Sequence, residues 1–291
     1  MSLEMKRSSD AISLFERNEN SRGINLIFTQ EGREEDMVRY TVKPIVLGTL
    51  EGDKSSFTYM NFPGVLIKLD VTYFMIKGTP NKSGRVLVDT GSWAALMAKY
   101  WPGKGADLQT FEESLQKEGM TVDDVDIIIQ TQLHHDHCGN TSKCKNAEVY
   151  IQEKEWAFAQ SPHPLQAQYY PKELFQGWKV RLISGDYELF PGLTILSTPG
   201  HTPGTQSVAI DTDKGKVVIA GMCSIYQTFE EPKKVLPADH PFAAWEVFVP
   251  AIATDMDQNY NSVLRVKKLA EILFPCHGPG FSKKTRRYLN R

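Results

Sequence analysis

The stretch TQLHHDHCGN, residues 131–140, decides how this chain is interpreted, because it places three of the seven histidines and an aspartate side by side. It begins at the last residue of DIIIQT, residues 126–131, which form a predicted strand. Protonated imidazoles packed together repel one another, whereas neutral imidazoles with a carboxylate are good ligands for a divalent metal. The stretch therefore predicts a metal site at a strand end. The alternative is a polar loop whose histidines bind nothing.

Two further histidines lie in similar surroundings farther along the chain. His201 occurs in STPGHTPG, residues 197–204, and His277 occurs in FPCHGPG, residues 274–280. Each follows a β-like run and has glycine beside it, which lets the backbone approach a ligand closely. Taken singly, either histidine is more often structural than a ligand. Together with residues 131–140, they indicate ligands that meet at the ends of several strands.

The rest of the chain alternates β-rich runs with segments typical of helices. The run RVLVDTG, residues 85–91, leads into a helix-compatible segment at residues 93–100, and a longer helix is expected at residues 259–270. No repeat of about 20–50 residues and no linker of pure Gly, Ser or Pro is evident. We therefore expect an N-terminal appendage at residues 1–25 and a single domain of mixed α and β structure at residues 26–291.

Composition excludes several classes of protein. The 33 Lys and Arg nearly balance the 35 Asp and Glu, for a formal net charge of −2, so no overall field attracts nucleic acid or anionic lipid. No run approaches the roughly 20 apolar residues that a membrane-spanning helix needs, and the first residues lack the apolar core of a signal peptide. The four cysteines are too scattered for a disulfide framework. We expect a cytoplasmic protein with reduced thiols that binds neither nucleic acid nor membrane.

In this order, the motifs resemble those of the metallo-β-lactamase superfamily of hydrolases. The matching segments are LVDTG at residues 87–91, DHCG at 136–139, STPGHTPG at 197–204 and CHGP at 276–279. The match spans roughly residues 62–281. Within the superfamily, the β-rich lead-in and the segment at residues 262–269 are most similar to the N-acyl-homoserine lactonase branch. The resemblance implies an α/β fold, a four-layer αβ/βα sandwich of two mixed sheets with helices outside and metal at one edge.

The resemblance also implies the metal ligands. By the matching positions they are His134, Asp136, His137, His201 and His277. Two positions depart from the family pattern, because Gln132 stands where the first motif histidine is expected and Met222 where a bridging aspartate is expected. A bridged pair of ions would need a substitute carboxylate or thiolate. Cys223 is one candidate, provided that the strand has ended or bulged there, and Asp255 and Asp257 are others.

The two departures favour one metal ion over two. The set that includes Gln132 keeps only two imidazoles and a neutral amide oxygen, a weak ligand for zinc. The other set, Asp136, His137 and His277, is the combination of two histidines and a carboxylate that suits zinc or ferrous iron and leaves positions open for water. We therefore predict one zinc ion, with iron or manganese as alternatives.

Other residues receive roles through the same resemblance. Asp136 is expected to help move a proton to the leaving group as well as bind metal. Tyr226 is a candidate to donate a hydrogen bond to a substrate carbonyl, although the family pattern would place that tyrosine at Ile225 and a packed tyrosine is the alternative. Asp89 is expected to orient the ligand loop through hydrogen bonds. His135 is expected either to contact the metal ligands without binding the metal itself or to face the substrate.

The resemblance implies a metal-dependent hydrolase that acts on an ester, lactone, thioester or amide of a small molecule through hydroxide formed on the metal. Loss of the first histidine and the bridging aspartate predicts reduced activity. The alternative is a non-catalytic protein that binds a small molecule or a partner on a degenerate scaffold. A nuclease of the same superfamily would need a positive groove, which the charge balance does not supply.

Aromatic residues within 156–178 and 232–253 suggest an apolar pocket wall. The oligomeric state stays open.

Overall fold

The computed structural model describes residues 40–78, 85–101 and 103–278. Two units divide the chain, Met1–Met37 and Val38–Arg291, and every described residue belongs to the second unit. The predicted appendage at residues 1–25 lies outside the described residues. The proposed division into an appendage and one domain therefore stays a prediction.

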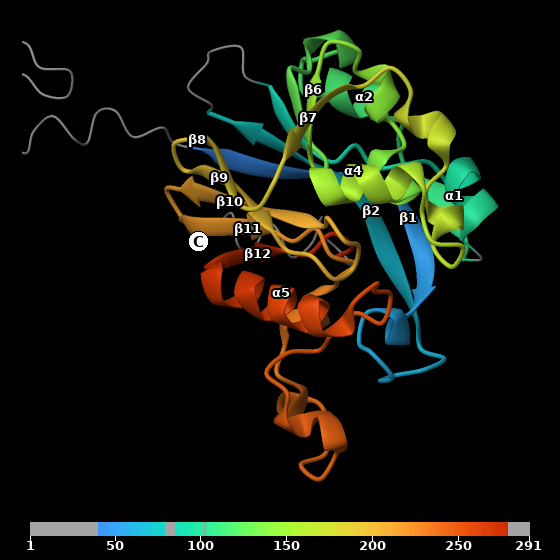
Figure 1. The fold of residues 1–291 in the computed structure, drawn as a ribbon, viewed down its shortest axis with the longest axis vertical. Helices are drawn as coiled ribbons and strands as arrows, with labels where there is room; N and C mark the ends of the chain where they lie inside the picture. Colours follow the sequence, from blue (N-terminus) through green and yellow to red (C-terminus); the bar gives the residue numbers. More distant parts are fainter. Residues whose placement is uncertain (1–39, 79–84, 102, 279–291) are drawn as a thin grey trace, which may run out of the picture. The chain divides into compact units, whose positions relative to one another are not determined.

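Seven of the described strands form one mixed sheet in the order β4-β1-β2-β3-β5-β6-β7 (Figure 1). These strands are β1 (Thr41–Asp53), β2 (Leu66–Lys77), β3 (Val86–Val88), β4 (Gly105–Asp107), β5 (Ile127–Ile129), β6 (Glu148–Gln152) and β7 (Lys179–Ile183). The pairs β4–β1, β1–β2 and β2–β3 are antiparallel, whereas β3, β5, β6 and β7 run parallel.

Five further strands form a second mixed sheet in the order β12-β11-β10-β9-β8. They are β8 (Tyr187–Phe190), β9 (Leu193–Ser197), β10 (Gln206–Thr212), β11 (Gly215–Ile219) and β12 (Ile272–Phe274). Strands β8 to β11 pair antiparallel, and β12 joins β11 in parallel with Phe274 beside Ile219.

Helices cover the outer faces of both sheets (Figure 1). The α-helices are α1 (Ala94–Tyr100), α2 (Phe111–Gln116), α3 (His135–Cys138), α4 (Glu153–Gln160) and α5 (Met256–Leu269). Short 3₁₀ helices lie in the loops, at η2 (Lys54–Ser56), η3 (Val122–Asp124), η4 (Thr141–Lys143), η5 (Ala167–Tyr169), η6 (Lys172–Phe175), η7 (Tyr226–Phe229), η8 (Pro232–Lys234) and η9 (Pro241–Ala244). Among the residues described, no helix combines the length and apolar character needed to span a membrane.

Alternating strand residues build the layers, because successive side chains on a strand point to opposite faces. In β10, Val208 and Ile210 pack into the core between the two sheets, whereas Ala209 packs with Val263 of α5 in a separate outer core. Likewise, helices α1, α2 and α4 share an outer core with the other face of the seven-stranded sheet. This arrangement confirms the predicted four-layer sandwich of two mixed sheets.

The topology brings the chemistry-bearing loops to one edge of the sandwich. Strands β3 and β5 run parallel, so the loops after them, which carry Asp89 and residues 130–137, leave the sheet at the same end. Strands β11 and β12 also run parallel, so Met222 and His277 follow neighbouring strand ends of the other sheet. The predicted site therefore draws on both sheets.

Candidate metal centre

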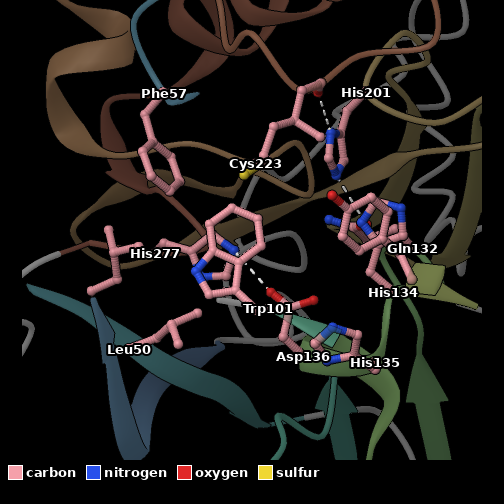
Figure 2. A pocket seen from close by; sticks show the side chains of 13 residues that line it. Leu50, Phe57, Trp101, Gln132, His134, His135, Asp136, His201, Cys223 and His277 are labelled. Carbon is pink, nitrogen blue, oxygen red and sulfur yellow. Dashed lines mark hydrogen bonds and ion pairs between the residues drawn. The ribbon is translucent and has the colours of Figure 1, made fainter. Parts of the chain in front are cut away.

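A pocket opens where these strand ends meet (Figure 2). Its polar lining consists of Gln132, His134, His135, Asp136, Tyr169, His201 and His277. Its apolar lining consists of Leu50, Phe57, Leu69, Trp101, Cys223 and Ile252. Leu50 and Phe57 lie on one side of Figure 2, and His134, Gln132 and His201 lie on the other. The pocket thus joins an imidazole-rich wall to an apolar wall.

The ligand loop is held rigidly by its own backbone. Its short helix α3 begins after His134, and the backbone N–H groups of His137 and Cys138 both donate to the carbonyl oxygen of His134 at 3.0 and 3.2 Å. A side chain at Gly139 would bring a Cβ to 2.9 Å from the carbonyl oxygen of Gly91, so only glycine lets these two segments approach so closely. The loop therefore presents His134 and Asp136 to the pocket from a fixed frame.

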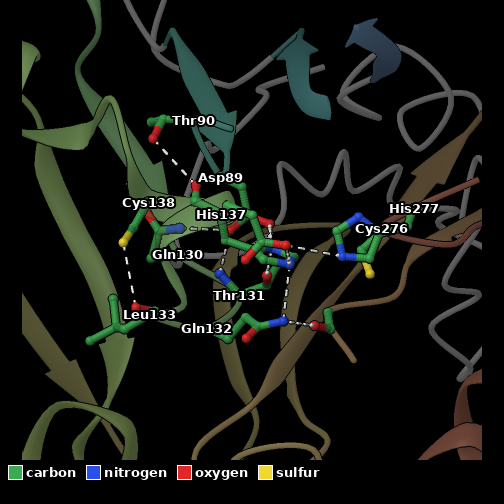
Figure 3. Close-up of polar contacts among 12 residues, drawn as sticks. Asp89, Thr90, Gln130, Thr131, Gln132, Leu133, His137, Cys138, Cys276 and His277 are labelled. Carbon is green, nitrogen blue, oxygen red and sulfur yellow. Dashed lines mark hydrogen bonds and ion pairs between the residues drawn. The ribbon is translucent and has the colours of Figure 1, made fainter. Parts of the chain in front are cut away.

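Asp89 orients His137 (Figure 3). Nδ1–H of His137 donates to Oδ2 of Asp89 at 2.7 Å, and the carboxylate also accepts from the backbone and hydroxyl of Thr131, both at 2.7 Å, and from Gln130 at 2.9 Å. Asp89 has φ of 59°, a left-handed conformation that is uncommon for a non-glycine residue. These bonds fix the orientation of the His137 ring and direct its Nε2 toward the site.

Gln132 lies between two imidazoles. Its amide N–H donates to Nε2 of His137 at 3.0 Å and to the carbonyl oxygen of Gly221 at 3.2 Å, while its Oε1 is 3.1 Å from Nε2 of His201. Nδ1–H of His201 donates to the carbonyl oxygen of Ile252 at 2.6 Å. A neutral imidazole carries one N–H, so Oε1 of Gln132 and Nε2 of His201 face each other with two lone pairs. A cation satisfies such a pair.

The donor set at this side of the pocket fits a metal ion. Burial, followed by neighbouring imidazoles, lowers the pKa of His134 well below its ordinary value, and burial lowers the pKa of His201 to about 4. Both rings are therefore neutral near pH 7, as metal ligands must be. Nε2 of His134 is buried and has no hydrogen-bond partner among the described residues. An unpaired buried nitrogen next to His201, with ring centroids 4.8 Å apart, is a ready ligand.

On the other side of the pocket, Asp136 lies between two imidazoles. Its Oδ2 is 3.3 Å from Nε2 of His277 and 3.8 Å from Nε2 of His137. Burial alone would raise the pKa of Asp136, but these imidazoles hold it well below its ordinary value. Burial alone would likewise lower the pKa of His137, but Asp136 and Asp89 raise it well above its ordinary value. The carboxylate supplies this side with the negative charge that the Gln132 side lacks.

Cys276 lies beside the same imidazoles and was missed by the sequence analysis. The ligand atoms of His137, Cys276 and His277 all lie within 4.8 Å of one another, and all three residues are buried. Burial alone would raise the pKa of the Cys276 thiol, but His277 and a contact with His137 lower it to about 6. The sequence carries one signal for it, its position directly before a predicted ligand.

Glu155 of α4 was also missed. It is fully buried, and its carboxylate accepts from the backbone N–H of Leu133 at 2.9 Å, from the hydroxyls of Thr202 and Tyr170, and from the backbone N–H of Gly204 at 3.2 Å. Burial raises its pKa. Glu155 thus ties the loop that carries His134 to the loop that carries His201.

Several predicted site residues lie close together in the structure. The structure brings together His134, Asp136, His137, His201, His277, Gln132 and Asp89. His135 lines the pocket and packs against Tyr100 with ring centroids 5.1 Å apart. Cys223 also lines the pocket, within the apolar cluster that includes Leu50 and Phe57.

Other candidates lie elsewhere. Neither Tyr226 nor Ile225 is among the pocket-lining residues: Tyr226 packs against the core between the sheets, and Ile225 packs in the apolar cluster of Leu50, Phe57 and Cys223. Met222 is buried in the outer core beneath α5. Asp255 caps α5 by accepting from the backbone N–H of Gln258 at 2.9 Å, and Asp257 is exposed in its first turn. Strand β11 ends at Ile219, before Met222 and Tyr226, so alternation along the strand does not predict where their side chains point.

Comparison with known proteins supports the resemblance. The family model described as the metallo-beta-lactamase superfamily matches residues 67–277. An N-acyl homoserine lactonase of Bacillus cereus is 30% identical over 207 residues, covering 67% of this chain and 77% of the relative. An N-acyl homoserine lactonase of Bacillus thuringiensis is 29% identical over 239 residues, covering 77% and 88%.

Solved structures agree. A quorum-quenching N-acyl homoserine lactone lactonase superposes with a TM-score of 0.67 at 29% identity, covering 85% of this chain and 95% of that chain. An N-acyl homoserine lactone hydrolase with the product N-hexanoyl-L-homoserine at its catalytic metal center gives a TM-score of 0.65 at 28% identity, covering 85% and 96%. The predicted class, a metal-dependent hydrolase, is confirmed, and the chain belongs to the metallo-beta-lactamase superfamily.

Proposed function

We propose that this protein opens the lactone ring of a small molecule that carries an apolar acyl chain, in the manner of an N-acyl homoserine lactonase. One observation carries the proposal: four of the predicted ligands, His134, Asp136, His201 and His277, line a pocket that is also lined by apolar side chains. The relatives that cover most of this chain are named as lactonases, which supports the same substrate class. The alternative of a non-catalytic binding protein would not require five metal-ligand residues to converge.

We propose zinc as the metal, one ion for each chain, with iron or manganese as alternatives. The ion is expected at Asp136, His137 and His277, because that side of the pocket carries the negative charge that a divalent cation needs. The opposite side offers only the neutral groups of Gln132, His134 and His201. When bound, zinc would polarise the lactone carbonyl and make a water molecule more acidic.

The chain's own residues then have separate tasks. Asp136, the more exposed partner in its contact with His137, is placed to take a proton at its carboxylate and pass it to the alcohol that leaves the ring. Asp89 holds His137 in the tautomer that leaves Nε2 free. His135 faces the substrate side of the pocket. No such role is proposed for Tyr226, and the apolar wall around Leu50 would take the acyl chain and exclude water.

We infer a cytoplasmic location, since the four cysteines are all buried free thiols, as is usual in a reducing compartment. The proposed partner is the small-molecule substrate.

Ring opening releases a proton, so a weakly buffered assay tests the function directly. We expect turnover of acyl homoserine lactones, with faster turnover for longer acyl chains. Asp136→Asn should lower the rate by about 10²–10⁴-fold, the usual contribution of acid–base catalysis. The matched control is Asp257→Asn, at an exposed position in α5, which should leave the rate unchanged. No lactone turnover by metal-loaded protein, or equal rates for both variants, would contradict the proposal.

A further inference from the structure

The thiol of Cys276 lies beside Met222, the position at which this chain lacks the bridging carboxylate of the family pattern. Its Sγ lies 2.8 Å from the carbonyl oxygen of Met222, the residue that stands at that position, and it accepts a hydrogen bond from the backbone N–H of Ser224 at 3.2 Å. The side chain of Met222 is directed into the outer core beneath α5. A sulfur atom from the neighbouring strand therefore lies beside the backbone where a carboxylate is missing.

The sheet register explains this placement. Strands β11 and β12 run parallel with Ile219 beside Phe274, and two residues beyond that pair the register leads to Gly221 and Cys276. The backbone N–H of His277 donates to the carbonyl oxygen of Ser224 at 3.0 Å, which continues the contact past the strand ends. The position of the thiol thus follows from sheet pairing and does not depend on a flexible loop.

The surroundings of the thiol are those of a metal ligand. Its sulfur lies with the ligand nitrogens of His137 and His277 in a group whose members are within 4.8 Å of one another (Figure 3). Thiolate, imidazole and carboxylate are the three ligand types that zinc takes in proteins. The N–H of Ser224 would continue to donate to the sulfur after metal binding, as supporting hydrogen bonds do around bound metals.

We propose that Cys276 is a ligand of the metal ion, which it binds together with His137 and His277. The inference rests on the proposed function only in requiring that the protein binds a metal ion. On binding, the S–H bond breaks, its proton goes to solvent and the sulfur donates an electron pair to the cation, with no change of oxidation state. The thiolate supplies negative charge in place of the aspartate absent at Met222.

Cobalt gives a direct test, because thiolate ligation produces an intense sulfur-to-cobalt charge-transfer band in the near ultraviolet. We expect the full-length protein loaded with Co²⁺ to show this band, and Cys276→Ser to lose it. Two matched controls should keep it: Cys223→Ser, which removes the pocket-lining thiol predicted from the sequence, and Cys144→Ser, which removes a buried thiol of the outer core. Zinc affinity of Cys276→Ser should fall by more than the roughly 10–100-fold that loss of a supporting partner costs.

A second measurement on the unmodified protein covers the case in which Cys276→Ser does not fold. X-ray absorption at the zinc edge should show one sulfur neighbour at about 2.3 Å. Failure to take up either metal, a bound metal with no sulfur neighbour, or a band lost only in Cys223→Ser would overturn the inference. If the zinc-loaded protein turns over lactone but its zinc has no sulfur neighbour, the proposed function stands and only the Cys276 ligand is contradicted. If its zinc has a sulfur neighbour but the protein turns over no lactone, only the proposed function is contradicted.

Discussion

Gln132 is one of the two residues at which this site departs from the family pattern. An imidazole at this position would direct a lone pair toward His134 and His201, whereas the amide gives a weak carbonyl ligand and donates its N–H to Nε2 of His137. That hydrogen bond stabilises the metal-free site by only about 1 kcal/mol, which a metal–imidazole bond readily exceeds. We therefore expect Gln132 to weaken one half of the site without preventing metal binding in the other half.

Gln132→His should raise the metal content from about one toward two ions per chain, because it completes a set of three imidazoles with His134 and His201. Elemental mass spectrometry on protein dialysed against zinc measures this directly. The matched control is Gln130→His, which changes a buried glutamine that contacts Asp89 on the side away from the pocket. An unchanged metal content in Gln132→His would show that the amide is not what limits the second ion.

Restoring the missing aspartate should not restore a second ion. Met222 is buried among Ala220, Phe229 and Val263, so Met222→Asp places a carboxylate in an apolar core. We expect a loss of about 3–5 kcal/mol in the free energy of unfolding, the cost of an unpaired buried charge. Met222→Leu, which conserves volume, should cost under about 1.5 kcal/mol. Chemical denaturation compares the two variants, and a Met222→Asp protein of undiminished stability with a second bound metal would refute this expectation.

Helix α4 has a structural part in the site although it contributes no ligand. Glu155 connects the loop after β5 to the loop after β9 through bonds to Leu133, Thr202 and Gly204. The pocket geometry thus depends on a helix that packs against the opposite face of the sheet from the inter-sheet core. Elements that hold ligand loops determine metal affinity as well as stability.

Glu155→Gln should weaken zinc binding by about 10–100-fold while leaving every ligand in place, since an amide N–H would face the donors Thr202 and Gly204. Loss of those bonds should also cost about 1–3 kcal/mol of stability. Chelator competition measures the affinity. Glu153→Gln, which removes a carboxylate from the first turn of the same helix, is the matched control. Equal affinities for the two variants would remove Glu155 from the account of the site.

The elements that carry strong periodicity could be predicted from the sequence, and those at strand ends could not. The apolar run before residue 131 predicts β5, and the pattern at residues 259–270 predicts α5, which in fact begins at Met256. Strand β11 ends at Ile219, so no period-2 rule applies to residues 222–226. For that reason Tyr226 and Cys223 are candidates with open alternatives from the sequence, whereas Cys276 became visible only through the pairing of β11 with β12.

The whole molecule joins its two sheets at the metal centre. Asp136 and His137 come from loops of the seven-stranded sheet, and His201 and His277 come from loops of the five-stranded sheet. A bound ion therefore links two layers that otherwise contact through their apolar core. Because the unfolded chain does not hold these groups together, metal binding is expected to stabilise the fold.

Metal removal should lower the unfolding temperature. A ligand present at 100 times its Kd adds about 2.7 kcal/mol to the free energy of unfolding, and each kcal/mol corresponds to about 2–4 °C for a domain of this size class. Calorimetry with zinc and after chelator treatment measures the difference. His137→Ala, which loses a ligand, should show a much smaller difference between the two conditions. An unfolding temperature independent of zinc would show that the ion does not link the sheets.

We infer that this chain uses a single metal ion to open a lactone ring, and a zinc titration of the metal-free protein is the sharpest test of this inference. Zinc is added in steps, and the rate of proton release from an N-acyl homoserine lactone is measured at each step. We expect no turnover without zinc. The rate of proton release should rise linearly with added zinc and level off at one zinc per chain. Turnover that does not depend on metal, or no turnover at any zinc concentration, would contradict this inference.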